Sequence, residues 1–234
     1  MRPRPICWNW PKRWWPMNKR YAIFDMDGTL IDSMSYWKGL AEEYLHSKGV
    51  SQVPLAILER IKPMTMTESA ALFVQEFHLR GTAGFVAAEM NAMMEDHYRE
   101  DIPLKNGVAA YLQKLRGRGV QMCVASATAE HLMEACLRRL GVLKYFSFLL
   151  SCESVGAGKN RPDVYDASAR RLGAKPPEVA VYEDALYAAQ TAKDAGYYVV
   201  GVYDDSADAH WEEMTQLADE TIRRFDTDIQ EQTH

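Results

Sequence analysis

Short runs of apolar residues recur along the chain at the length of buried β-strands. They lie at residues 21–24, 120–125, 148–151, 179–182 and 197–202. Between the later runs the apolar positions follow a helical period, over about residues 128–140, 162–173 and 184–195. These helical segments stop at Gly141, Gly173 and Gly196, and the second starts at Pro162, which are common helix boundaries. Alternating strands and helices predict an α/β fold, a three-layer α/β/α core with a parallel sheet.

Residues from about 31 to 101 interrupt this alternation with helical patterns alone. The apolar residues of the first repeat at helical spacing and end at Gly49: Met34, Trp37, Ala41, Tyr44 and Leu45. Thr65 and Glu68 form a capping-box sequence ahead of a helix predicted over 69–79. A further helix is predicted around Phe85, Met90, Met93 and Met94, with the methionines in the core. Such an insertion after the first strand is typical of a lid over strand ends.

This pattern predicts a division of the chain into a catalytic core, a helical cap and two tails. The core takes residues 17–31 and 102–226, the inserted α-helical cap 32–101, and the tails 1–16 and 227–234. The N-terminal tail is rich in Trp and Pro, and residues 1–20 carry six basic side chains and no acid. Two interpretations of this tail stay open. It is a disordered extension or upstream translated sequence, which we favour, or a binding element for membrane surfaces or nucleic acid.

Composition indicates a globular protein with enough apolar material for a sizeable core. The 234 residues are 47% hydrophobic and 25% charged. The net charge of −5 argues against nucleic acid as the main partner. No apolar run has the length of a transmembrane helix, which predicts no membrane partner. The four cysteines, Cys7, Cys123, Cys136 and Cys152, show no close pairing, so reduced thiols and a cytoplasmic location are predicted.

Two aspartates and a flexible turn follow the first predicted strand, in the sequence FDMDGTL. Asp25 and Asp27 are two positions apart, so in extended chain they point the same way, at the strand end where α/β proteins bind ligands. Two adjacent carboxylates repel, and oxygen ligands favour Mg²⁺ as the compensating cation. Gly28 permits a tight turn, and the Thr29 hydroxyl with nearby amides suits an anion. A metal beside an anion cradle predicts a phosphoryl group. The alternative is a plain turn capped by its aspartates.

Three later strand ends carry further candidate groups. Ser126 and Ala127 precede a helix start, where free amides bind anions, although a plain N-cap is the alternative. Lys159 follows a glycine loop that is not a nucleotide-binding P-loop, because Asn160 stands where that motif needs Ser or Thr. Glu183 and Asp184 end another strand and either bind metal or cap the next helix. All of these groups, like Asp25 and Asp27, lie at the ends of predicted strands, which favours one shared site.

These four motifs resemble those of the haloacid dehalogenase superfamily, in its helical-cap branch of β-phosphoglucomutase-like and phosphoglycolate phosphatase-like enzymes. FDMDGTL is similar to the first motif, Ser126 to the second, Lys159 to the third, and Glu183 with Asp184 to the fourth. The resemblance covers about residues 20–205 and implies a Rossmann-like core. Three positions depart from the family pattern: Asn160 follows the lysine where proline is common, Glu183 stands where glycine is common before Asp184, and Ala188 holds the place of a later acid. Metal binding is then expected to rest on the adjacent pair Glu183 and Asp184.

The resemblance implies a mechanism and a role for each motif residue. Asp25 attacks phosphorus, Asp27 is the general acid and base, and Mg²⁺ binds Asp25, the Asp27 backbone carbonyl, Glu183 and Asp184. The groups that stabilise the phosphoryl oxygens are Lys159, Ser126 and amides near Gly28, Thr29 and Ala127. A Mg²⁺-dependent phosphatase acting on a small phosphorylated metabolite is the leading prediction. A phosphomutase is the alternative, and Trp37 and Lys62 are candidates for facing the substrate.

Overall fold

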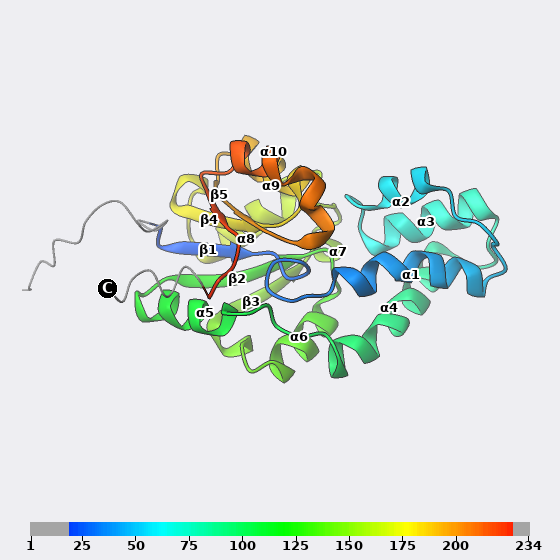
Figure 1. Ribbon diagram of the computed structural model, residues 1–234, viewed down its shortest axis with the longest axis horizontal. Helices are drawn as coiled ribbons and strands as arrows, with labels where there is room; N and C mark the ends of the chain where they lie inside the picture. The colour runs from blue at the N-terminus through cyan, green and yellow to red at the C-terminus, as the bar shows by residue number, and fades with distance from the viewer. Residues whose placement is uncertain (1–18, 227–234) are drawn as a thin grey trace, which may run out of the picture.

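The computed structural model of the protein describes residues 19–226, so the two predicted tails lie outside the described residues. Six parallel strands form one sheet in the order β3-β2-β1-β4-β5-β6 (Figure 1). The strands are β1 (Tyr21–Phe24), β2 (Gln121–Ser126), β3 (Phe146–Ser151), β4 (Val179–Glu183), β5 (Tyr198–Val202) and β6 (Glu220–Ile222). The central strand β1 pairs with β2 and β4, and Phe24 lies opposite both Val124 and Tyr182.

The strands β1, β2, β4 and β5 are largely apolar because both faces of the sheet are covered. On one face, residues such as Phe24 and Tyr182 pack against α5 (Val108–Gly117) and α6 (Glu130–Arg139), and these two rings stack with centroids 4.1 Å apart. On the other face, alternate residues such as Ile23 pack against α8 (Asp163–Leu172), α9 (Leu186–Asp194) and α10 (Trp211–Leu217). Successive strand residues point to opposite faces, which produces these two cores. The predicted three-layer α/β/α architecture is confirmed.

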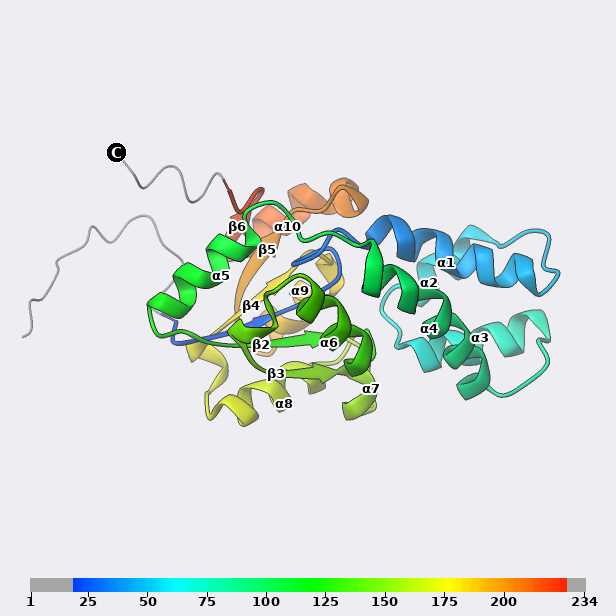
Figure 2. The same cartoon turned by 90° about the horizontal axis from the view of Figure 1, so that it is seen from below.

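Four of the five helices between β1 and β2 form a helical insertion beyond the carboxyl ends of the strands (Figure 2). They are α1 (Met34–Ser47), α2 (Leu55–Ile61), α3 (Met66–Phe77) and α4 (Ala83–Glu100). The predicted capping box is present, but α3 begins at Met66 because the box residues themselves form its first turn. Met90 and Met94 of α4 are buried as expected. Phe85 is 56% exposed, so it lies outside the buried face of that helix.

Several elements of the structure are missing from the sequence prediction: α2, α5, α7 (Cys152–Val155), α10 and β6. The strand β6 has three residues, two of them polar, and gives no apolar run. In contrast, α5 buries Val108, Tyr111, Leu112 and Leu115 at clear helical spacing, and the prediction overlooked it. No helix within residues 19–226 is long and apolar enough to cross a bilayer.

The two linkers of the helical insertion lie side by side. Ile31 and Leu104 form an isolated antiparallel bridge. The Asp32 N–H donates to the Pro103 carbonyl at 3.0 Å, and the Lys105 N–H donates to the Leu30 carbonyl at 3.0 Å. The chain therefore leaves the sheet and returns to it at one place.

Candidate active site

Three carboxylates from two neighbouring strand ends gather in a buried cluster. Asp25 follows β1 directly, Glu183 ends β4, and Asp184 comes next in the chain. One oxygen of each lies within 4.8 Å of the others, and all three residues are buried. Because β1 and β4 pair in parallel, with the Asp25 N–H donating to the Tyr182 carbonyl at 2.9 Å, their carboxyl ends bring these acids together.

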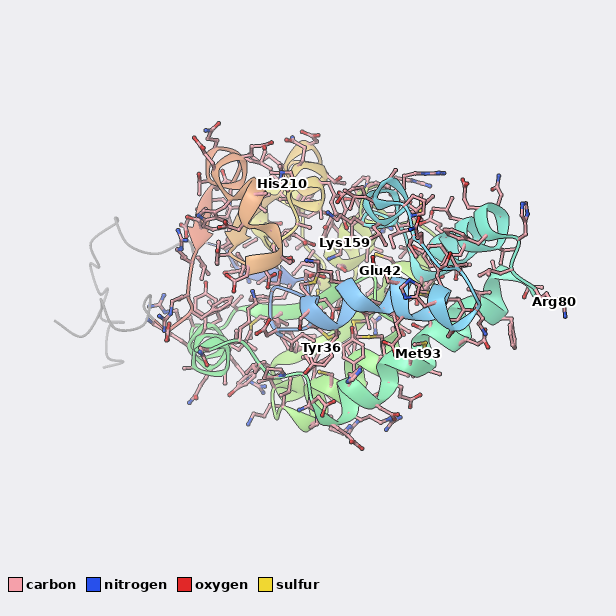
Figure 3. All side chains as sticks on the ribbon, turned by 45° about the vertical axis from the view of Figure 1, so that its right-hand side comes forward. Tyr36, Glu42, Arg80, Met93, Lys159 and His210 are labelled. Atoms are coloured by element: carbon pink, nitrogen blue, oxygen red, sulfur yellow. The ribbon has the colours of Figure 1, made fainter. Side chains whose placement is uncertain are left out.

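Lys159 is the cation of this cluster. Its ammonium group donates to Asp25 Oδ1 and, at 2.6 Å, to Glu183 Oε1. Burial lowers the pKa of Lys159, but the two carboxylates more than offset this, so its pKa lies well above the ordinary value. The Tyr165 hydroxyl donates to the same Glu183 oxygen at 2.7 Å. Figure 3 shows Lys159 at the junction between the sheet and the helical insertion.

The donor set of the cluster fits a divalent metal ion. If ionised, three buried carboxylates beside one lysine would leave two negative charges uncompensated. Burial, together with Glu183 and other neighbouring acids, raises the pKa of Asp25 despite Lys159. Burial and the charge of Glu183 likewise raise the pKa of Asp184 to about 7. A dication relieves this repulsion, and an all-oxygen donor set is one that Mg²⁺ prefers. Asp25, Glu183 and Asp184 therefore form a candidate metal site.

The turn after β1 packs directly on Asp184. The Thr29 hydroxyl donates to Asp184 Oδ1 at 3.0 Å. Gly28 has φ of +79°, a conformation that side chains disfavour. In this arrangement the Thr29 hydroxyl orients a candidate metal ligand. The contact of Thr29 with an anion stays a prediction.

The side chain of Asp27 has different surroundings from that of Asp25. Its Oδ1 atom accepts hydrogen bonds from three side chains: Ser33 at 2.6 Å, Trp37 at 3.0 Å and Tyr98 at 2.7 Å. Its Oδ2 atom accepts from Thr128 at 2.7 Å and from Ser126 at 3.3 Å. One aspartate thus lies among acids and a lysine, and the other among neutral donors.

Of the other predicted residues, Ser126 donates to Asp27 Oδ2, and Ala127, the next residue in the chain, is partly exposed. Trp37 reaches Asp27 through its indole nitrogen. The Lys62 side chain pairs with Glu59 instead and is 55% exposed.

The segment between α2 and α3, with the first turn of α3, lies against α7, the loop that bears Lys159 and the start of α9. The backbone N–H and the hydroxyl of Thr67 both donate to the Glu153 carboxylate at 3.0 Å. The Tyr187 hydroxyl donates to the Lys62 carbonyl at 2.7 Å. A Cβ on Gly158 would lie 2.4 Å from the Pro63 carbonyl oxygen, so glycine permits this close approach. The helical insertion is therefore closed over the carboxylate cluster.

Sequence reasoning missed four residues of this site: Ser33, Tyr98, Thr128 and Tyr165. Ser33 precedes an apolar helix, which normally indicates a helix cap, yet its side chain makes no capping hydrogen bond and donates to Asp27 instead. Tyr98 lies 71 positions from Asp27 and Tyr165 18 positions from Glu183. No local pattern marks either tyrosine as more than a core residue.

A family profile described as haloacid dehalogenase-like hydrolase matches residues 19–196. The chain belongs to this family. This haloacid dehalogenase-like hydrolase is 29% identical over 191 residues to fructose-1-phosphate phosphatase YqaB of Escherichia coli K12, covering 80% of this chain and 98% of that protein. It is 28% identical to (DL)-glycerol-3-phosphatase 1, mitochondrial, of Arabidopsis thaliana, over 80% of this chain. That match spans 65% of the plant protein's length.

The hydrolase is also 26% identical to β-phosphoglucomutase of Bacillus subtilis, over 77% of this chain and 82% of that protein. Among solved structures, CbbY from Rhodobacter sphaeroides in complex with phosphate superposes with a TM-score of 0.76 at 22% identity, covering 88% of this chain and 95% of that one. This structural likeness confirms the fold. The sequence relatives place the chain in the phosphatase and phosphomutase group of haloacid dehalogenase-like hydrolases.

Proposed function

We propose that the protein is a Mg²⁺-dependent phosphatase that hydrolyses a small phosphorylated sugar or polyol through an aspartyl-phosphate intermediate. The observation that carries this proposal is the buried pairing of Asp25 with Lys159 inside a cluster of acids. A carboxylate held there is placed to attack phosphorus while the lysine and a metal compensate charge. The names of two relatives, a fructose-1-phosphate phosphatase and a glycerol-3-phosphatase, support the substrate class.

In the first step, a carboxylate oxygen of Asp25 forms a bond to phosphorus as the bond to the leaving oxygen breaks. Asp27 gives its proton to that leaving oxygen, so the sugar or polyol departs as a neutral alcohol. In the second step, water attacks the phosphorus of the aspartyl-phosphate and Asp27 takes the water's proton. The bond between the Asp25 oxygen and phosphorus breaks, inorganic phosphate is released, and both aspartates return to their starting state.

The remaining residues of the site bind and compensate charge. Asp25, Glu183 and Asp184, with the Asp27 backbone carbonyl, would hold Mg²⁺. When bound, the ion offsets the repulsion between the Asp25 carboxylate and the phosphate. Lys159 stabilises negative charge on the transferring group, and the predicted phosphate contacts of Ser126 and the amides near Gly28 and Ala127 add to this.

Phosphomutase activity is the second candidate, and the match to β-phosphoglucomutase of B. subtilis favours it. Its chemistry differs only in the acceptor, because a sugar hydroxyl takes the phosphoryl group instead of water. We prefer hydrolysis because other relatives of similar identity are named as phosphatases.

Phosphate release from a panel of sugar, polyol and nucleotide phosphates, with Mg²⁺ present, tests the proposal. We expect turnover concentrated among the sugar and polyol phosphates and abolished in Asp25→Asn, since an amide is a poor nucleophile of nearly equal size. Turnover retained in Asp25→Asn contradicts the assignment. Conversion of a hexose 1-phosphate to the 6-phosphate without phosphate release, followed by ³¹P NMR, identifies the mutase instead.

A further inference from the structure

The carboxylate of Asp27 is held by five side-chain donors, and three of them come from the helical insertion or the linker that leads into it. These three are Ser33, Trp37 and Tyr98, all bonded to Oδ1. The Trp37 N–H is shared with the Tyr98 hydroxyl at 2.7 Å, and the Ser126 contact is longer at 3.3 Å. The closest donors are therefore Ser33, Tyr98 and Thr128, fewer than the roughly four acceptor positions of a carboxylate, which leaves a position for the proton. The orientation of Asp27 is therefore set largely by residues outside the sheet that carries it.

Tyr98 is the most constrained of these donors. It is fully buried, and its hydroxyl donates to Asp27 Oδ1 at 2.7 Å. The same hydroxyl oxygen lies 2.7 Å from Trp37 Nε1 and 3.2 Å from Thr128 Oγ1. Trp37 and Thr128 are themselves donors to Asp27, so the tyrosine hydroxyl joins the donors of both carboxylate oxygens.

The backbone of Tyr98 is fixed independently by an arginine from the core. Arg139, on α6, donates through Nε to the Tyr98 carbonyl at 3.0 Å and through Nη2 to the Ile102 carbonyl. Carbonyls in the last turn of a helix such as α4 lack partners within the helix and need such donors. Tyr98 is therefore held at both ends, by Arg139 through its backbone and by the Asp27 network through its hydroxyl.

We propose that Tyr98 is a positioning residue for Asp27, and that Arg139 sets the place of Tyr98 by fixing the end of α4. This inference rests on the proposed function, because it takes Asp27 as the acid that protonates the leaving oxygen. Loss of the Tyr98 hydroxyl lets Asp27 rotate away from the leaving group. The loss falls on proton transfer, which an alkyl phosphate needs and a p-nitrophenyl phosphate does not.

The test compares kcat/KM for glycerol phosphate and p-nitrophenyl phosphate in the full chain with Mg²⁺. This parameter reports steps up to the first phosphoryl transfer, so later hydrolysis does not mask the effect. For Tyr98→Phe we expect a loss on the order of 10-fold with glycerol phosphate, below the 10²- to 10⁴-fold typical of a whole general acid. With p-nitrophenyl phosphate we expect a change of less than about twofold, because that leaving group needs no acid.

Two matched controls separate positioning from general destabilisation. Tyr111→Phe removes another buried hydroxyl, which lies 3.0 Å from the Tyr182 hydroxyl, and should leave the ratio of the two kcat/KM values unchanged. Arg139→Gln should shift the ratio in the same direction as Tyr98→Phe, whereas Arg138→Gln, at an exposed neighbour paired with Glu134, should not. The double variant Asp27→Asn with Tyr98→Phe should show the same ratio of the two kcat/KM values as Asp27→Asn alone.

The outcomes distinguish this inference from the proposed function. Suppose that Tyr98→Phe lowers kcat/KM equally for both substrates, whereas Asp27→Asn lowers it far more for glycerol phosphate than for p-nitrophenyl phosphate. That result overturns the positioning role alone. If Asp27→Asn lowers kcat/KM equally for both substrates, Asp27 is not the general acid, and the positioning role of Tyr98 is overturned as well. A wild-type protein that releases no phosphate from any substrate overturns the proposed function itself.

Discussion

Gly28 and Asp184 approach so closely that a Cβ on Gly28 would lie 2.4 Å from Asp184 Oδ2. The contact joins the turn after β1 to the strand end of β4, and the Thr29 hydroxyl reinforces it from the next position. Glycine at residue 28 thus serves two needs, a left-handed backbone conformation and space for a candidate metal ligand.

Gly28→Ala should weaken metal binding more than it weakens the fold. The methyl group displaces the Asp184 carboxylate, and the strained backbone costs about 1–3 kcal/mol of stability. We expect the Mg²⁺ concentration for half-maximal activity to rise by at least about 10-fold, measured by titrating phosphate release. Gly39→Ala is the control: outside its own turn of α1, a Cβ at Gly39 would meet no atom within 4 Å, and alanine there should add about 0.5–1 kcal/mol of stability. An unchanged Mg²⁺ dependence in Gly28→Ala would argue against Asp184 as a ligand.

Removal of divalent metal should abolish turnover, because three buried carboxylates otherwise face an anionic substrate. Phosphate release in excess EDTA and its recovery with Mg²⁺ measure this. Ca²⁺ should inhibit, since it takes more ligands in looser geometry than an in-line attack tolerates. Mg²⁺ should also raise the melting temperature, since it binds the folded chain. Full activity in EDTA would contradict the proposed chemistry.

The metal-free protein should lose stability as the pH rises from about 4 to about 7. Burial and then the charge of Glu183 raise the pKa of Asp184 to about 7, whereas in an unfolded chain it is about 4. Between these values the unfolded chain releases the proton and the folded chain retains it, which favours unfolding. Urea midpoints in EDTA across this range should fall for wild type and fall less for Asp184→Asn. A fall of the same size in the variant would show that other groups cause it.

The contact between Thr67 and Glu153 should govern how firmly the helical insertion closes. Glu153→Ala removes two hydrogen bonds at an exposed position, each contributing about 0.5–1.5 kcal/mol. We expect faster hydrogen exchange over residues 62–68, a KM raised by a few fold and a melting temperature lowered by only a few degrees. Glu134→Ala, which removes a surface pair within α6, is the matched control. Unchanged exchange in Glu153→Ala would show that other contacts hold the closure.

The parts of the fold that the sequence predicted are those with strong local patterns. Strands buried on both faces read as continuous apolar runs, and the acids at their ends marked the site. The strand β6 is too short and polar for this, and its place depends on pairing with β5. The network around Asp27 was also beyond local reasoning. Tyr98 reaches Asp27 only because α4 packs on α6 at a particular rotation, which the tertiary contacts of Arg139 fix.

The pairing of the two linkers, through Ile31 and Leu104, has a consequence for how such a protein can diversify. Because the chain leaves and rejoins the sheet at adjacent points, a segment of almost any length can be spliced between them with little strain on β1 and β2. Loop-closure cost grows slowly with length, so the sheet places few limits on what is inserted. The inserted helices can then change by recombination while the carboxylate cluster at the strand ends is inherited intact.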